Sequence, residues 1–328
     1  MSLIVDTFGR QVEYLRLSVT DRCDFRCVYC MSEDPCFLER EQVLSLEELA
    51  WVGQAFTELG VKKIRLTGGE PLVRTDCDKL VKQLGALPGL SELSMTTNGS
   101  RLTKFANKMR DSGLSRLNIS LDTLKPDLFT ELTRNGKVER VIAGIDAAKA
   151  AGFKRIKINA VILRGQNDDE VLDLIEFCRD RELDIAFIEE MPIGVIDERK
   201  ESRHCSSEEV KAIISERYKL MLSNKRTGGP ARYYTMPGSP IHVGFISPHS
   251  NNFCHECNRV RVTVEGRLLL CLGNEHSVDL KAIVREYPGD IQRLKTAILE
   301  AIKRKPKEHV FGDQGDVQIL RFMNATGG

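Results

Sequence analysis

Six of the ten cysteines fall into two groups of three. The first group, Cys23, Cys27 and Cys30, lies in the stretch TDRCDFRCVYCMS. In a structural zinc site four protein ligands occupy every coordination position, whereas a cubane iron–sulfur cluster takes one cysteine thiolate per iron. No fourth cysteine or histidine stands at zinc-finger spacing, because all six histidines follow residue 200. The group therefore predicts a cluster with one iron free for a ligand, and a zinc or redox loop is the alternative.

The second group also has three members. It consists of Cys254, Cys257 and, after thirteen intervening residues, Cys271. From spacing alone, a zinc ribbon completed by a distant histidine, His249 or His255, is one interpretation. A second cluster with an open iron, which could bind an atom of the substrate, is the other.

Two arginines follow the second group along a predicted strand. Arg259 and Arg261 alternate in the stretch CNRVRVT, so both side chains lie on one face of that strand. Planar guanidinium groups suit the oxygens of phosphate. The pattern predicts a phosphate-bearing ligand beside the second group.

The composition is that of an ordinary globular protein, with 328 residues of which 41% are hydrophobic and 29% charged. The net charge of +1 provides no bulk field for nucleic acid or an anionic membrane. No apolar run approaches the length of a membrane span, and the first residues do not resemble a signal peptide. We therefore expect a cytoplasmic protein, in which cysteines serve metal binding or catalysis rather than disulfides. The four scattered cysteines are expected to be ordinary thiols: Cys36, Cys77, Cys178 and Cys205.

Strands and helices alternate six times in the first part of the chain. Strands are predicted at 14–20, 62–66, 92–97, 115–121, 154–163 and 184–190. Helices are predicted at 45–60, 76–87, 101–112, 126–133, 138–151 and 168–182. Capping boxes support the helix that follows Ser45 and a later one that follows Ser206. A hairpin at 259–272 and a helix near 290–304 are predicted beyond residue 192.

This alternation predicts a parallel α/β sheet with right-handed crossovers. Several strands have apolar residues on one face and polar or cationic residues on the other; Leu15 and Leu17, for example, alternate with Arg16. That suits an incomplete (β/α)6 barrel, TIM-like, whose lumen holds a hydrophilic ligand. We expect the barrel to span residues 1–195 and a C-terminal region, carrying the second cysteine group, to span 196–328.

Short polar motifs follow the predicted strands at their carboxyl ends, where parallel α/β folds bind ligands. The motifs are TGGEP (67–71), TTNG (96–99), Ser120–Asp122 and EEMP (189–192). In TGGEP, two glycines allow close backbone approach and Glu70 offers an acceptor for an amino group or hydroxyls; a purely structural turn is the alternative.

Three cations are predicted to face the lumen: Arg16, Arg65 and Lys157. An unpaired buried cation is costly, so the three together imply an anionic ligand. The alternative is that they pair with acids at the rim, namely Glu70, Asp122, Glu189 or Glu190.

The CxxxCxxC spacing, with Tyr29 before the last cysteine, and the TGGEP motif together resemble the radical S-adenosylmethionine (SAM) superfamily. The resemblance implies that the first three cysteines hold a 4Fe–4S cluster whose unique iron is chelated by SAM. It also implies SAM contacts for Tyr29, Gly69, Glu70, Ser120 and Met191.

Both cysteine groups, the CNRVRVT strand and the terminal Gly327–Gly328 pair resemble the GTP 3′,8-cyclase family of molybdenum cofactor biosynthesis over essentially the whole chain. The resemblance implies a second 4Fe–4S cluster on Cys254, Cys257 and Cys271, and a catalytic role for the terminal pair. Thr326 departs from the pattern, because an apolar residue is expected there. The residues that match GTP-binding positions are Arg16, Arg65, Thr96, Lys157, Arg259, Val260 and Arg261.

The implied activity is a lyase reaction. A 5′-deoxyadenosyl radical removes the C3′ hydrogen of GTP, and the C3′ radical adds to guanine C8 to give (8S)-3′,8-cyclo-7,8-dihydroguanosine 5′-triphosphate. The implied partners are GTP, an external electron donor and a downstream cyclic pyranopterin monophosphate synthase, with homodimer formation left open and no nucleic acid or membrane. A peptide-modifying radical SAM enzyme and a non-catalytic zinc- or cluster-stabilised module are the alternatives.

Overall fold

The computed structural model describes residues 3–191, 203–248, 250, 253–274, 276–309 and 323–327. Its strands are β1 Tyr14–Ser18, β2 Lys63–Thr67, β3 Glu92–Thr97, β4 Arg116–Ser120, β5 Ile156–Ile162, β6 Asp184–Glu189, β7 Met221–Leu222, β8 Arg232–Thr235, β9 His242–Ile246, β10 Arg259–Val262, β11 Arg267–Leu269 and β12 Ser277–Asp279. Its helices are α1 Leu46–Glu58, α2 Cys77–Gly85, α3 Leu102–Asp111, α4 Pro126–Thr133, α5 Val138–Ala150, α6 Val171–Asp180, α8 Ser207–Ser215, α9 Leu280–Glu286, α10 Ile291–Ile302 and α11 Met323–Thr326. None of the helices in these ranges is long and apolar enough to cross a membrane.

The twelve strands form a single sheet, in the order β12-β11-β10-β1-β2-β3-β4-β5-β6-β9-β8-β7. Strands β1 to β6 are parallel and lie side by side in chain order, which confirms the predicted α/β alternation. The C-terminal part of the chain supplies both flanks, because β10 pairs in parallel with β1 and β9 pairs in parallel with β6. The predicted boundary between residues 195 and 196 lies outside the described residues and stays a prediction.

Two capping boxes begin helices where the sequence predicted them. The Ser45 hydroxyl accepts a hydrogen bond from the backbone N–H of Glu48 at 3.1 Å, and the Glu48 carboxylate accepts one from the N–H of Ser45 at 2.7 Å. Ser206 and Glu209 repeat this arrangement at α8. The predicted hairpin is also present as antiparallel β10 and β11. The β8–β9 hairpin and α9 were not predicted.

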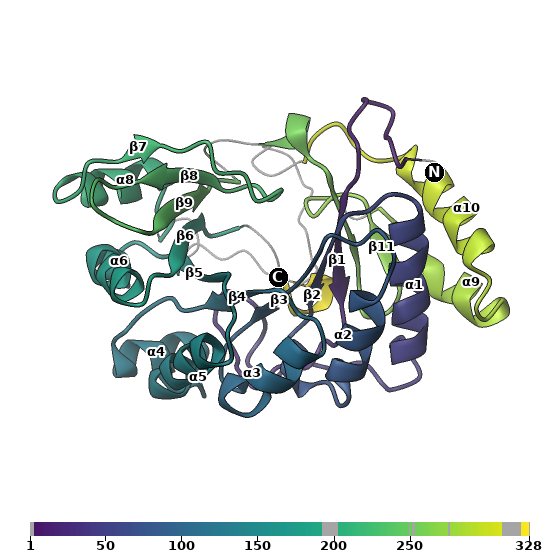
Figure 1. The fold of residues 1–328 in the computed structure, drawn as a ribbon, viewed down its shortest axis with the longest axis horizontal. Coiled ribbons are helices and arrows are strands. Elements are labelled where there is room, and N and C mark those ends of the chain that lie inside the picture. Colours follow the sequence, from purple (N-terminus) through teal and green to yellow (C-terminus); the bar gives the residue numbers. More distant parts are fainter. Residues whose placement is uncertain are drawn as a thin grey trace.

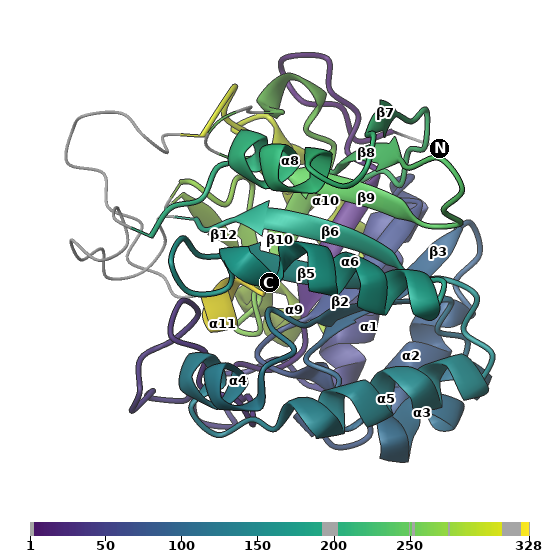
Figure 2. The same cartoon turned by 90° about the vertical axis from the view of Figure 1, so that its left-hand side faces the viewer.

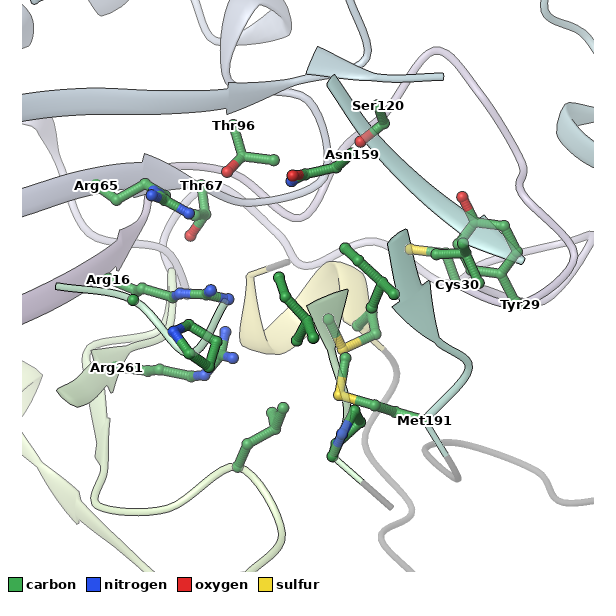
Figure 3. A pocket seen from close by; sticks show the side chains of 18 of the residues that line it. Arg16, Tyr29, Cys30, Arg65, Thr67, Thr96, Ser120, Asn159, Met191 and Arg261 are labelled. Carbon is green, nitrogen blue, oxygen red and sulfur yellow. The ribbon is translucent and has the colours of Figure 1, made fainter. Parts of the chain in front are cut away.

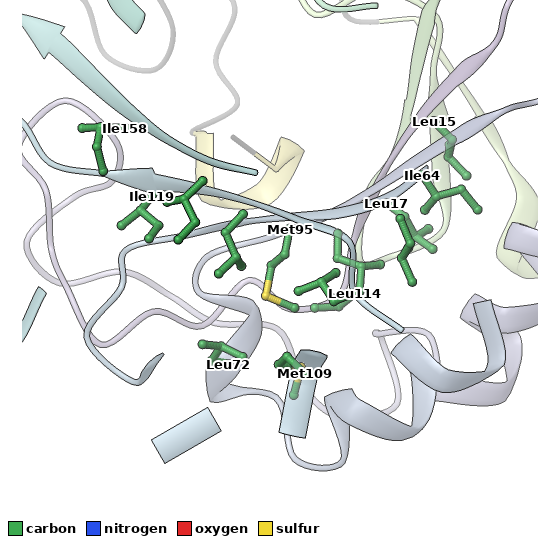
Figure 4. Packing of buried hydrophobic residues seen from close by; sticks show 14 of the residues in the cluster. Leu15, Leu17, Ile64, Leu72, Met95, Met109, Leu114, Ile119 and Ile158 are labelled. Carbon is green, nitrogen blue, oxygen red and sulfur yellow. The ribbon is translucent and has the colours of Figure 1, made fainter. Parts of the chain in front are cut away.

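The apolar face of the sheet forms the main core. Leu15, Leu17, Ile64 and Ile119 are fully buried there, together with residues from the covering helices such as Met109 (Figure 4). Helices α1 to α6 lie on this outer face (Figures 1 and 2), and α9 and α10 pack beside α1. The polar side chains of the same strands therefore point to the opposite, inner face, as the period-two alternation predicted.

Candidate active site

One large cavity lies on the inner face of the sheet. In Figure 3, Arg16, Arg65 and Arg261 lie on one side of it and Tyr29, Cys30 and Met191 on the other. The cavity brings together almost all predicted site residues, from segments more than 200 residues apart. Those that line it are Arg16, Cys23, Cys27, Tyr29, Cys30, Arg65, Gly69, Thr96, Ser120, Lys157, Met191, Cys254, Cys257, Arg259, Val260, Arg261 and Cys271.

Val260 contributes to the cavity wall differently from its neighbours. Its side chain belongs to the hydrophobic core and is 1% exposed, because it alternates with Arg259 and Arg261 along β10. A GTP contact at Val260 stays a prediction.

The first cysteine loop is held by the TGGEP turn. The N–H of Gly69 donates to the carbonyl of Thr20 at 2.7 Å, and the N–H of Glu70 donates to the carbonyl of Arg22 at 2.8 Å. A Cβ atom on Gly69 would lie 2.3 Å from the Arg22 carbonyl oxygen, and one on Gly68 would lie 2.3 Å from that of Thr20. The two glycines therefore allow the backbone of the cysteine loop to approach closely. From the sequence, close approach of a ligand was expected at these glycines instead.

Glu70 stands behind the cavity wall and is not one of the residues that line it. Its carboxylate accepts hydrogen bonds from the N–H of Leu72 at 3.0 Å, the hydroxyl of Thr97 at 2.8 Å and the N–H of Asn98 at 2.7 Å. Burial raises its pKa to about 7, although these hydrogen bonds act in the opposite direction. Glu70 thus ties the TGGEP and TTNG turns together, and a direct contact with SAM stays a prediction.

Tyr29 connects the cysteine loop to the end of β4. Its hydroxyl donates to the carboxylate of Asp122 at 2.5 Å, and the second Asp122 oxygen accepts from the N–H of Val161 at 2.9 Å. Burial raises the pKa of Asp122 to about 6 and that of Tyr29 well above its usual value. Asp122 lines the cavity but was not among the predicted site residues.

The second cysteine group has three thiols of unequal character. For Cys257, burial raises the thiol pKa, but the nearby Arg259 and Lys305 cations outweigh it and the net shift is downward. Burial raises the pKa of both Cys254 and Cys271. A thiolate is the form that ligates iron, so the cations favour the metal-binding state of Cys257.

The donor sets fit iron–sulfur clusters better than the zinc alternatives. The three thiols of each group line the same cavity, and none of the six is in a disulfide. The side chain of His255 is 68% exposed and lies 3.8 Å from the Glu256 carboxylate, so it is directed into solvent rather than completing a zinc ribbon. His249 lies outside the described residues. Within the described ranges, no three His, Cys, Asp or Glu side chains converge closely enough to hold one metal ion.

Three arginines form a row across neighbouring strands, because Arg16 is in register with Arg261 on one side and Arg65 on the other. Burial, with the neighbouring guanidiniums of Arg65 and Arg259, lowers the pKa of Arg16 to about 10. Burial also lowers the pKa of Arg261 and of Lys157 well below the usual values. These shifts mark positive charges that no carboxylate among the described residues neutralises.

The acids at the rim are occupied elsewhere. Glu190 forms two hydrogen bonds with Arg203, at 2.8 and 2.5 Å, and Glu189 accepts from Ser207 and Ser250. Five cations line the cavity: Arg16, Arg65, Lys157, Arg259 and Arg261. Among the described residues, none of them has a carboxylate within 4.0 Å. The predicted alternative, in which rim acids pair with these cations, is therefore wrong, and the cavity calls for an anionic ligand.

The C-terminal tail enters the same space. The Arg261 guanidinium donates to the carbonyl oxygen of Gly327, and Thr326 is 1% exposed with its hydroxyl donating to the carbonyl of Met323 at 3.3 Å. Gly327 has a φ of 76°, and a Cβ atom there would lie 2.2 Å from the Thr67 hydroxyl. The internal hydrogen bond explains how a threonine is accepted at position 326. Gly328 lies outside the described residues.

Several polar atoms on the inner face have no hydrogen-bond partner among the described residues, and of the residues that carry them only Arg16 was predicted as a site residue. They are the Thr67 hydroxyl, the Arg16 Nε, the Asn159 carbonyl oxygen and both amide atoms of Asn118. Thr67, Arg16 and Asn159 line the cavity. Period-two alternation was the signal that could have identified them, since it had already placed these positions on the polar face. Unpaired buried polar atoms here indicate a polar ligand.

Comparison with known families agrees with this arrangement. Residues 17–178 match the Radical SAM superfamily, and residues 183–311 match Molybdenum Cofactor Synthesis C. The chain is 60% identical over 327 residues to a GTP 3′,8-cyclase of Pseudomonas entomophila, covering 99% of this chain and 98% of that protein. It is 57% identical over 326 residues to a GTP 3′,8-cyclase of Marinobacter nauticus, with the same two shares covered.

The solved structures of Streptococcus suis SuiB share the fold. SuiB bound to S-adenosylmethionine has a TM-score of 0.62 and 16% identity, with 90% of this chain and 69% of that chain covered. SuiB bound to its precursor peptide SuiA has a TM-score of 0.63 and 18% identity, with 92% and 75% covered. At such identity the likeness concerns the fold alone, whereas the curated relatives are similar in sequence along their whole length. The peptide-modifying and non-catalytic alternatives therefore give way: the chain belongs to the GTP 3′,8-cyclase family of radical SAM enzymes.

Proposed function

We propose that this chain converts GTP to (8S)-3′,8-cyclo-7,8-dihydroguanosine 5′-triphosphate in molybdenum cofactor biosynthesis, using two 4Fe–4S clusters and SAM. The observation that carries the proposal is one cavity lined by both cysteine triads and by five cations that have no carboxylate partner in the described part of the chain. One triad suits SAM, and the other, with the arginines beside it, suits a nucleotide triphosphate.

The first cluster, when bound, would supply the electron that splits SAM into methionine and a 5′-deoxyadenosyl radical. Cys23, Cys27 and Cys30 would hold it, with Tyr29, Gly69, Ser120 and Met191 around the SAM molecule. The contribution of the protein is orientation and the exclusion of water and of groups that would quench a radical. The hydrogen bond from Tyr29 to Asp122 helps by fixing the loop against β4.

The triphosphate would be bound by the arginine row. Arg16, Arg65 and Arg261 stand side by side across three strands, and guanidinium groups bind phosphate oxygens through paired hydrogen bonds. Thr96, Lys157 and Arg259 add polar and cationic contacts along the same wall. The guanine would then lie toward the second cluster on Cys254, Cys257 and Cys271, within reach of the tail that carries Gly327.

The same proposal includes the incomplete barrel. We infer that β1 to β6 form a partial, TIM-like (β/α)6 barrel around SAM, and that the C-terminal region from about residue 196 carries the second cluster. Such a reaction requires an external electron donor, and we infer that a downstream cyclic pyranopterin monophosphate synthase consumes its product.

The test is product analysis after anaerobic incubation with reductant, SAM and GTP. Wild-type protein should contain about eight irons per chain and yield the cyclic nucleotide. Cys23→Ala should abolish SAM cleavage, whereas Cys254→Ala should retain some uncoupled cleavage without cyclic product. Full product formation by either variant would rule the assignment out.

A further inference from the structure

A buried lysine lies against the second cysteine group, outside the residues assigned so far. Lys305 follows α10 and is 3% exposed. Its ammonium group is 3.6 Å from the Cys257 sulfur, 3.1 Å from the carbonyl oxygen of Arg259 and 2.5 Å from that of Leu270. All three of its N–H groups are thereby used. No carboxylate of the described residues lies within 4.0 Å, so its charge is directed at the thiol and the two carbonyls.

The position of Lys305 is fixed by the N-terminal segment of the chain. Arg10 donates to the carbonyls of Pro306 and Lys307, each at 2.6 Å, and to the carbonyl of Cys254 at 2.7 Å. Arg10 is in turn paired with Asp6 at 2.6 Å. One guanidinium therefore holds the segment that carries the lysine against the segment that carries the cysteines.

The first cysteine group has different surroundings. The Cys23 sulfur accepts from two neutral donors, the N–H of Phe25 at 3.4 Å and the side-chain amide of Asn98 at 3.8 Å. The cations nearby are directed elsewhere, because Arg26 donates to the Cys23 carbonyl at 2.7 Å and Arg101 pairs with Asp24 at 3.2 Å. The Cys23 and Cys257 sulfurs thus line one cavity but differ in their donors, which are neutral groups at Cys23 and an ammonium group at Cys257.

We propose that Lys305 raises the reduction potential of the second cluster through its charge and its N–H···S bond to Cys257. Adding an electron makes a cluster more negative, so a neighbouring fixed cation stabilises the reduced state more than the oxidised one. Lys305 is a positioning and tuning residue, and its role rests on the proposed function, in which Cys257 ligates a cluster.

The experiment is an anaerobic redox titration of the holoenzyme followed by EPR. The first cluster is identified by the response of its signal to SAM and serves as an internal reference. Lys305→Met should shift the midpoint of the second cluster negatively by at least the equivalent of a tenfold change in the reduction equilibrium, which is 59 mV for one electron. The midpoint of the first cluster should not move. Lys305→Arg should stay near the wild type, and Lys305→Gln should follow Lys305→Met because it lacks the charge.

Lys303→Met is the matched control, because Lys303 is two residues away, 64% exposed and paired with Glu300 at 2.6 Å. An unmoved second midpoint in an iron-replete Lys305→Met, or an equal shift of both clusters, would overturn the proposal. If Lys305→Met loses iron, the comparison of Lys305→Gln with Lys305→Arg tests the proposal instead. Equal midpoint potentials of the second cluster in these two variants would refute an effect of the Lys305 charge. A wild type with about four irons or no cyclic product would reject the proposed function instead, whatever Lys305 does.

Discussion

Replacing Gly327 by alanine should release the C-terminal tail from the cavity. The added Cβ would lie 2.2 Å from the Thr67 hydroxyl and 3.1 Å from the Thr67 Cβ, so one of the two segments must move. Alanine would also have to adopt a φ of 76°, which is a left-handed conformation that L-residues with a Cβ disfavour.

The magnitude follows from two contributions. The left-handed backbone costs alanine about 1–2 kcal/mol. Movement of the tail would also break the hydrogen bond from the Arg261 guanidinium to the Gly327 carbonyl, and a hydrogen bond to a charged group is worth about 1.5–3 kcal/mol. Together these amounts lower the docking equilibrium of the tail by roughly two to four powers of ten, since about 1.4 kcal/mol corresponds to tenfold.

Two assays report on the tail. Trimming by a carboxypeptidase, followed by intact mass, measures how often the tail leaves the cavity, and the ratio of SAM cleaved to cyclic product measures coupling. Gly327→Ala should be trimmed much faster and should cleave SAM without matching product. Gly238→Ala is the matched control, because Gly238 has a φ of 73° and nothing within 4 Å of its Cβ position. Thr67→Ala combined with Gly327→Ala should recover part of the protection, because the closest clashing atom is gone.

Trimming of Gly327→Ala at the wild-type rate would refute the reasoning, since it would mean that the tail does not occupy the observed position. An equal effect of Gly238→Ala would attribute the result to general backbone strain. A double variant no better protected than Gly327→Ala alone would exclude the contact with Thr67 as the cause.

Three further perturbations test the electrostatics of the cavity. Tyr29→Phe removes the hydroxyl that donates to Asp122, and thermal unfolding should show a larger loss of stability at pH 8 than at pH 5. The pKa of Asp122 is raised to about 6, so its carboxylate is ionised at pH 8, and losing a hydrogen bond to a charged acceptor costs about 1.5–3 kcal/mol. Equal losses of stability at the two pH values would contradict this prediction. Because the folded-state pKa of Glu70 is raised to about 7, its contribution to stability is complete below its ordinary pKa and is lost as pH rises through 7, by about 3 kcal/mol at most. Glu70→Gln should flatten that dependence in chemical denaturation, and an unchanged slope would argue against the assignment. Arg16→Met should weaken GTP binding by roughly 10- to 100-fold in calorimetry, as expected for about 1.5–3 kcal/mol, and should leave SAM binding unchanged; equal weakening of both would reject the phosphate role.

Local patterns account for the parts of the fold that the sequence could predict. The serine and glutamate of the box at α1 are three residues apart, and the alternation of Leu15, Arg16 and Leu17 is visible within a single strand. Such features depend on neighbours along the chain, so each predicted strand from β1 to β6 and most helices are found close to their predicted positions. The shared position of Arg16, Arg65 and Lys157 on the inner face also followed from side-chain alternation, and the position of the cysteine loop followed because it leaves the carboxyl end of β1.

Features that depend on distant segments could not be predicted. Nothing in the stretch around Arg259 indicates that it would pair in parallel with β1, and nothing around Lys305 indicates that its ammonium group would reach Cys257. For Glu70, the residue type predicted an acceptor of hydrogen bonds, but the sequence did not show which groups would donate to it. A carboxylate in a glycine-rich turn suggests a ligand, yet three donors from the chain itself occupy its oxygens.

The pairing of β1 with β10 has a consequence for how the chain is made. Tyr14 in β1 is partnered by Arg259, so one edge of the first strand stays unpaired until almost the whole chain has left the ribosome. An open strand edge is a template for association with other chains, and contacts between residues so far apart in sequence form slowly. The first cysteine loop will therefore be synthesised, and will be exposed to solvent, well before the second cysteine group is available to complete the cavity. Loading of the first cluster during synthesis, or protection of that edge by a chaperone, would keep the growing chain from aggregating.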